Sequence, residues 1–249
     1  MFPFIHGWTS VQRSTQANMR LGVVLSFVAG ATNAGGFLAV GRYTSHMTGI
    51  VSSVADDLVL GRVAVALTGT LCLLAFVMGA MCTALLVNWG FQHRLRSSYS
   101  LPLLVESGAL LMFGLFGSRL NSMATIFLPL TVVLLCFIMG LQNAVITKIS
   151  KAEIRTTHIT GLVTDLGIEL GKLFYINKAG LQTPVRADRT RLRLQLTLIS
   201  SFFVGSLMGA LGFKYGGYIT TVPLAVLLWT LCLRPLLDDL RHLSGEAPH

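Results

Sequence analysis

The chain has 249 residues, of which 53% are hydrophobic and 12% are charged, and its formal net charge is +9. This composition excludes a soluble domain, which would lack the polar surface needed to cover its core, and it predicts an integral membrane protein in contact with lipid. An excess of lysine and arginine is typical of the cytoplasmic loops of membrane proteins, so the charge does not require a nucleic-acid partner, and we expect none.

Apolar runs of membrane-crossing length follow one another along the chain. Crossing about 30 Å of hydrocarbon takes roughly 20 helical residues, and six runs approach or exceed this length. They cover residues 21–41, 63–92, 101–118, 120–147, 194–213 and 215–233. The first run is longer than a signal-peptide core and lacks a convincing cleavage site, so we expect it to remain as a span. The sequence therefore predicts an all-α integral membrane protein with six transmembrane helices.

A polar box follows the first run and returns after the fourth. Residues 44–51 read Thr-Ser-His-Met-Thr-Gly-Ile-Val and residues 156–163 read Thr-Thr-His-Ile-Thr-Gly-Leu-Val, so five of the eight positions are identical. Matching Gly-x-x-Asn-Ala elements precede the boxes at residues 30–34 and 140–144. We infer a duplication within a single membrane domain, residues 1–249, with repeat one at 19–118 and repeat two at 120–234.

The distribution of positive charge predicts the topology. With six spans and a cytoplasmic N-terminus, fifteen of the 19 lysines and arginines face the cytoplasm, whereas eight spans would leave twelve there. The positive-inside rule favours six spans with both termini cytoplasmic. Three spans per repeat is an odd number, so the second repeat enters the membrane upside down, as a 3+3 inverted repeat. The basic stretch at residues 172–193 has no counterpart in the first repeat and is expected to be a cytoplasmic connector.

A short amphipathic segment follows each box. Apolar residues at helical spacing form a stripe in both copies, namely Ile50, Val51, Val54 and Leu58 in the first, and Leu162, Val163, Leu166 and Leu170 in the second. Roughly a dozen residues give about 18 Å of helix, which is too short to cross the bilayer. Each segment is therefore expected to be a half-helix, either re-entrant or interfacial, that begins at its box.

The two Thr-His-x-Thr-Gly boxes, the Gly-x-x-Asn-Ala element at 140–144 and the six-span plan resemble the YoaK-like bacterial membrane protein family, grouped as domain of unknown function 1275. The resemblance covers nearly the whole chain, from the first span to the sixth. It implies a multi-pass protein of the bacterial inner membrane. It implies no particular activity.

The boxes are candidate binding elements because a helix N-terminus presents unpaired N–H groups and the positive end of the helix dipole. Hydroxyls and imidazoles add directed hydrogen bonds, and glycine lets a ligand approach the backbone. The expected substrate-binding residues, of which the box threonines and histidines would line one central cavity, are Thr44, His46, Thr48, Gly49, Thr156, His158, Thr160, Gly161, Asn33 and Asn143. The alternative is that the threonines cap the helices, the histidines satisfy loop carbonyls, and the asparagines bond between helices.

Three carboxylates are candidates for proton coupling. Asp57 and Glu169 each lie eleven residues after a box histidine, and between antiparallel repeats each would approach the histidine of the other repeat. Their alternative role is that of solvated charges on a polar helix face. Glu106 is the only carboxylate inside an expected span, where desolvation favours proton uptake, although its place near the start of the run also suits the headgroup level.

These features predict a transporter or channel for a small polar or anionic solute. An intramembrane enzyme that uses the paired histidines is an alternative, and so is a structural or assembly protein whose basic connector binds acidic lipid. The sequence has no Gly-x-Ser-x-Gly elbow, His-Glu-x-x-His metal motif or phosphate loop, which makes an enzyme the weaker of these. We expect no cofactor and no metal, and the small six-span body makes a homodimer plausible.

Overall fold

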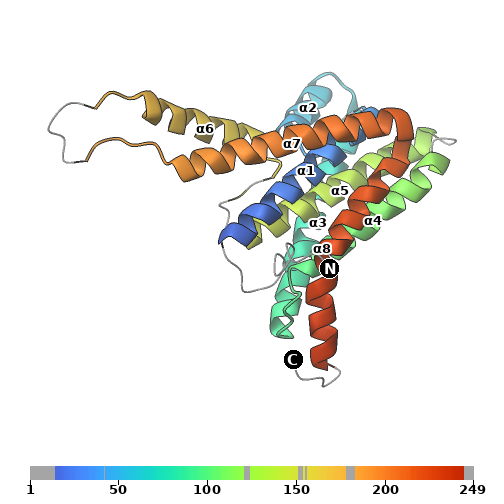
Figure 1. Ribbon diagram of the computed structural model, residues 1–249. Coiled ribbons are helices and arrows are strands. Elements are labelled where there is room, and N and C mark those ends of the chain that lie inside the picture. The colour runs from blue at the N-terminus through green and yellow to red at the C-terminus, as the bar shows by residue number, and fades with distance from the viewer. Residues whose placement is uncertain are drawn as a thin grey trace.

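The computed structural model of the protein describes residues 15–41, 43–120, 124–150, 154, 156–177 and 183–243. The segment before residue 15 and the part of the basic connector at residues 178–182 lie outside these ranges. Every regular element within them is a helix (Figure 1), which confirms the all-α prediction.

The helices begin and end close to the predicted apolar runs. Their bounds are α1 Thr15–Val40, α2 Met47–Val59, α3 Val63–Gln92, α4 Ser100–Leu120, α5 Ala124–Ile149, α6 Ile159–Phe174, α7 Arg189–Gly216, the 3-10 helix η3 Gly217–Thr220 and α8 Thr221–Leu243. Helix α7 starts before its apolar run because Asp188 caps it, accepting hydrogen bonds from the backbone N–H of Thr190 at 2.9 Å and of Arg191 at 3.2 Å. Part of the expected connector is therefore helical.

Four segments of the described chain are long and apolar enough to cross a membrane. They are Gln16–Leu38, Val63–Gln92, Leu130–Ile149 and Arg189–Arg241, of which the last contains α7, η3 and α8. Helix α4 contributes a shorter apolar stretch, Ser100–Leu115. The protein is therefore an integral membrane protein of several apolar helices, and the count of six spans stays a prediction.

Helices α1 and α5 form the centre of the structure. Helix α1 packs along α7, α3 packs along α5, α4 packs along α8, and α1 also contacts α5. In an 18-residue apolar stretch of each candidate span, 67% of the residues are buried in α1 and 61% in α5, against 28% in α3. The outer face of α3 exposes Leu67, Leu71, Leu74 and Met78, a stripe suited to contact with lipid tails.

The crossing of α1 with α7 brings two backbones into contact. A Cβ atom added to Gly30 would lie 2.1 Å from the carbonyl oxygen of Phe202, and one added to Gly205 would lie 2.1 Å from the carbonyl oxygen of Phe27. Any side chain at either glycine would push the helices apart. Small residues at such contacts are how helices associate closely in lipid, where burial of apolar surface gives no drive between helices.

The crossing of α3 with α5 uses the same contact. A Cβ atom added to Gly79 would lie 2.1 Å from the carbonyl oxygen of Phe137, and one added to Gly140 would lie 2.0 Å from the carbonyl oxygen of Phe76. All four glycines end a Phe-x-x-Gly motif, at residues 27–30, 76–79, 137–140 and 202–205. The first helix of each predicted repeat thus packs on the second long helix of the other repeat.

Helix α6 and the first turns of α7 extend side by side away from the remaining helices (Figure 1). Helix α2 occupies the corresponding place before α3, but a connection of only three residues, Leu60, Gly61 and Arg62, joins the two. Gly61 has a φ of +72°, a conformation that other residues adopt at a cost, so it closes this tight turn. The longer connection in the second half allows α6 and α7 to form the projecting hairpin.

Candidate functional site

Each box forms the entry to its short helix. Helix α2 begins at Met47 with His46 as the N-cap residue, and α6 begins at Ile159 with His158 as the N-cap residue. Neither histidine side chain makes a capping hydrogen bond. The threonines of the boxes therefore do not serve as the N-caps that the capping alternative assigned to them.

The box glycine makes room for the box histidine. A Cβ atom added to Gly49 would lie 2.2 Å from Cδ2 of His46, and one added to Gly161 would lie 2.3 Å from Nδ1 of His158. Each imidazole thus lies over the first turn of its own helix. The glycines were expected to let a ligand approach the backbone, but the histidine three residues earlier occupies the space beside each of them.

A hydrogen bond ties each box to the helix that precedes it. The side-chain oxygen of Asn33 accepts from the Ser45 hydroxyl at 2.9 Å and from the Ser45 backbone N–H at 3.2 Å. The Thr157 hydroxyl donates in the same way to the side-chain oxygen of Asn143. The asparagines thus anchor the boxes. Ser45 and Thr157 were not among the predicted site residues, although their matching positions in the two boxes were a usable signal.

The first threonine of each box is buried without a hydrogen-bond partner for its hydroxyl. Thr44 and Thr156 are both 0% exposed, and neither Oγ1 atom has a partner among the described residues. The histidine and the second threonine of each box are exposed, namely His46, Thr48, His158 and Thr160. The buried polar side chain of each box is therefore a single threonine, whose hydroxyl lacks the partner that buried polar groups normally have.

A second pair of polar side chains is associated with the contact between α1 and α5, because Gln142 of α5 bonds to Leu25 of α1 and Thr32 falls at helical spacing between Leu25 and Gly36. Thr32 Oγ1 and Gln142 Oε1 are buried and have no partner among the described residues. Gln142 uses its amide nitrogen to donate to the carbonyl of Leu25 at 3.3 Å, which joins α5 to α1. Thr32 precedes Asn33 as Gln142 precedes Asn143, so these two side chains are also equivalent by position.

The two boxes lie at different levels along α1. The hydroxyl of Ser26 donates to the carbonyl of Thr156 at 3.3 Å, whereas Thr44 Oγ1 lies 3.9 Å from a Cβ atom placed on Gly36. Ten residues separate Ser26 from Gly36, which corresponds to about 15 Å along the helix. Thr32 of α1 lies between these two levels. Each box therefore contacts α1, and the buried polar residue Thr32 lies at a level between the two contacts.

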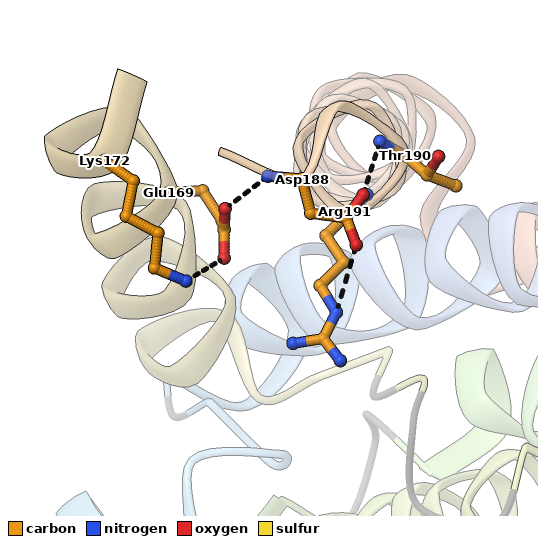
Figure 2. Close-up of polar contacts among 5 residues, drawn as sticks. All are labelled: Glu169, Lys172, Asp188, Thr190 and Arg191. Atoms are coloured by element: carbon orange, nitrogen blue, oxygen red, sulfur yellow. Dashed lines mark hydrogen bonds and ion pairs between the residues drawn. The ribbon is translucent and has the colours of Figure 1, made fainter. Parts of the chain in front are cut away.

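Asp57 and Glu169 are buried ion-pair partners, and not solvated charges. Asp57 is 5% exposed and pairs with Arg62, just before α3, with 2.8 Å between Oδ1 and Nη2. Glu169 is 4% exposed and accepts from Lys172 Nζ at 2.7 Å and from the backbone N–H of Asp188 at 2.8 Å (Figure 2). The partners that the structure gives these carboxylates are thus cations near them in sequence, in place of the box histidines of the other repeat.

These contacts join each short helix, α2 and α6, to the long helix that follows it. Arg62 and Asp188 are the N-cap residues of α3 and α7, so each carboxylate of a short helix holds the start of the next long helix. The ion pair with Lys172, together with the Asp188 N–H, holds the pKa of Glu169 below its usual value. These contacts favour a role for Asp57 and Glu169 in positioning the starts of α3 and α7.

Glu106 differs from the other two carboxylates. It is 0% exposed on α4, and neither of its carboxyl oxygens has a partner among the described residues. The neighbouring Ser107 donates to the carbonyl of Ala225 at 2.8 Å, which places this turn of α4 against α8. The side chain thus lies inside the helix bundle, away from the exposed surface of α4.

A protein-family model described as Protein of unknown function (DUF1275) matches residues 21–233 of the chain. This match runs from the buried part of α1 to the middle of α8 and includes both boxes. No curated protein and no solved structure matches the chain.

Proposed function

The chain belongs to the DUF1275 family, whose description names no activity, and we propose from its chemistry that it is a transporter or channel for a small polar or anionic solute. The proposed setting is the inner membrane, with six spans and both termini in the cytoplasm. The solute would pass along the contact between α1 and α5, between the levels of the two boxes.

We propose that the pathway lies between two halves related as an inverted repeat. The two Phe-x-x-Gly crossings support this repeat, because α1 meets α7 through the same glycine and carbonyl contacts by which α5 meets α3. The antiparallel contact of α1 with α5 adds to this support. Gln142 bonds to Leu25 near one end of the contact, and a Cβ atom on Gly36 would lie 3.1 Å from Leu135 near the other. A two-fold relation of this kind is the usual frame of secondary transporters.

One observation carries the proposal. Four buried oxygen atoms without partners, those of Thr32, Thr44, Gln142 and Thr156, lie on or against the two central helices at equivalent positions of the two repeats. A buried polar group without a hydrogen bond costs about 1–3 kcal/mol, so four of them in one core require an explanation. Water or a polar solute at these atoms would satisfy them, which is what a polar pathway through a bilayer needs.

The boxes supply the two ends of this pathway. In this proposal the N-termini of α2 and α6, with their imidazoles, lie at the two ends of the pathway, where the helix dipole favours an anion or a carbonyl oxygen. His46 and His158 are exposed and lie over their helix N-termini, as suits groups that receive a solute from water. We retain Glu106 as the candidate for proton coupling, because Asp57 and Glu169 are occupied by ion pairs.

A binding screen tests this proposal directly. Purified protein in detergent is heated in the presence of small polar and anionic solutes, and a solute that raises the melting temperature is taken as a ligand. Replacing Thr44 and Thr156 by Val removes the two hydroxyls at nearly constant volume and is expected to abolish the shift. The matched control is Thr68→Val with Thr230→Val, since these hydroxyls donate to carbonyls of their own helices. A ligand-induced shift that survives in the first variant would reject the proposed site.

A further inference from the structure

A continuous groove runs along α7 from its N-terminus toward the middle of the helix. Its upper part lies between α6 and α7 and is lined by Leu170, Leu173, Arg189, Leu192 and Arg193. Its lower part lies between α1 and α7 and is lined by residues that include Val23, Phe27, Ser200 and Val204. Leu196 and Thr197 line both parts, so the two hollows adjoin.

The mouth of the groove carries two unbalanced positive charges. Arg189 and Arg193 are one helical turn apart, are exposed, and have no ion pair with a described residue. Arg191, between them in sequence, is engaged by Asp188 at 3.6 Å. Two arginines spaced by a turn on one helix face are suited to hold a phosphate group, because each guanidinium donates several hydrogen bonds in a fixed plane.

The remainder of the groove is lined by apolar side chains and three small hydroxyl residues, Thr197, Ser200 and Ser201, and it has the length of one lipid leaflet. From Arg193 to Val204 the helix rises about 16 Å, close to half of the roughly 30 Å hydrocarbon core. Beside the groove, α7 exposes Phe203, Leu207 and Met208, in a segment that is a candidate membrane span. An occupant of this groove therefore needs an anionic head and a long apolar chain.

We propose that the groove is a binding site for an anionic diacyl phospholipid, whose phosphate lies between Arg189 and Arg193 and one of whose two acyl chains extends to Val204. The end of α6 supports a membrane location for the mouth, because Phe174, Tyr175 and Ile176 are 78%, 57% and 88% exposed. Aromatic and apolar side chains beside arginines are typical of the membrane interface. This site is independent of the solute pathway between α1 and α5.

The test measures lipid binding to the full-length protein in detergent. Dioleoyl phosphatidylglycerol and dioleoyl phosphatidylcholine are titrated separately while the melting temperature is recorded. We expect the anionic lipid to give the larger shift, and Arg189→Gln with Arg193→Gln to weaken its apparent affinity about tenfold or more. The matched control, Arg186→Gln with Arg234→Gln, removes two exposed charges outside the groove and is expected to keep the preference.

A second variant tests the acyl-chain part of the groove. Ser200→Trp adds bulk at an exposed lining position and is expected to abolish the shift with the anionic lipid while both arginines remain. The proposal is overturned if the two lipids stabilise the protein equally, if Arg189→Gln with Arg193→Gln keeps the preference, or if inorganic phosphate alone gives the same shift as phosphatidylglycerol.

Discussion

The side-chain oxygen of Asn33 accepts a hydrogen bond from the Ser45 hydroxyl at 2.9 Å, and this bond joins the first box to the helix that leads into it. Asn143 receives the equivalent bond from Thr157 in the second box. The relation explains why asparagine precedes both boxes at nearly the same distance. The two asparagines thus anchor the boxes, whereas the unpartnered hydroxyls of Thr44 and Thr156 remain available to a solute.

The first prediction concerns this anchor. Ser45→Ala is expected to lower the free energy of unfolding by about 1 kcal/mol because it removes the hydroxyl side of this bond, and Asn33→Ala by somewhat more because it also removes the acceptor of the Ser45 backbone N–H. The double variant should lose less than the sum of the two. Thermal unfolding of all three variants in detergent measures the coupling. Strict additivity would show that the bond contributes nothing to stability.

The second prediction concerns the box glycines. Gly49→Ala is expected to displace the His46 ring, since the added Cβ would lie 2.2 Å from Cδ2, and so to weaken solute binding. The double variant His46→Ala with Gly49→Ala should recover stability because the clash is gone, without recovering binding. Gly171→Ala is the matched control, as nothing lies within 4 Å of its added Cβ. It should be neutral or stabilise the helix by up to about 1 kcal/mol. Normal binding by Gly49→Ala would contradict the proposed role of the imidazole.

The third prediction concerns the helix crossings. Gly30→Ala and Gly140→Ala each place a methyl group against a backbone carbonyl, which cannot move aside as a side chain does. Each is expected to destabilise the protein by about 2–4 kcal/mol, and the two losses should be similar because the contacts are equivalent. Gly108→Ala, with open space around the added atom, serves as the control. Chemical unfolding in detergent measures all three.

Unequal losses at Gly30 and Gly140 would argue against the proposed equivalence of the two repeats. A loss at Gly108 as large as at the crossings would show that the helices tolerate no added methyl group at all, and the crossing contacts would then have no special role.

The fourth prediction concerns pH. Lys172 and the N–H of Asp188 hold the pKa of Glu169 below its usual value, so Glu169 contributes stability at pH above the unfolded pKa of about 4.3. That contribution is lost as the pH falls through the lower folded value. The melting temperature of Glu169→Gln should therefore fall less than that of the wild type between about pH 5 and pH 3. Asp165→Asn, at an exposed position of the same helix, is the control. Identical pH profiles of Glu169→Gln and the wild type would contradict the assignment.

Sequence reasoning was most accurate where apolar length or local polarity determines the element. The run at residues 63–92 coincides with α3, and the short helices α2 and α6 begin directly after the box histidines. The matching sequence elements drew attention to Asn33 and Asn143, and each of these accepts a hydrogen bond from a hydroxyl of the box that follows it. These features depend on the composition of one stretch of chain, which a single sequence displays.

The packing of one helix against another could not be predicted in the same way. Asp57 lies opposite an apolar stripe and so resembles a solvated residue, yet α3 follows closely enough to bury it against Arg62. The Phe-x-x-Gly motif is visible in the sequence, but glycine is common in membrane helices and only the crossings reveal its use.

Solute flux across a lipid bilayer tests the central claim most directly. The protein and the variant Thr32→Val with Gln142→Leu are reconstituted into proteoliposomes, and uptake of a solute that stabilises the purified protein is followed over time. Both substitutions keep the approximate volume but remove the two polar groups between the boxes. We predict that flux falls at least about tenfold in this variant, as expected from the loss of two buried hydrogen-bonding groups, while Thr68→Val with Thr230→Val retains wild-type flux. Undiminished flux in the Thr32 and Gln142 variant would contradict the proposed pathway.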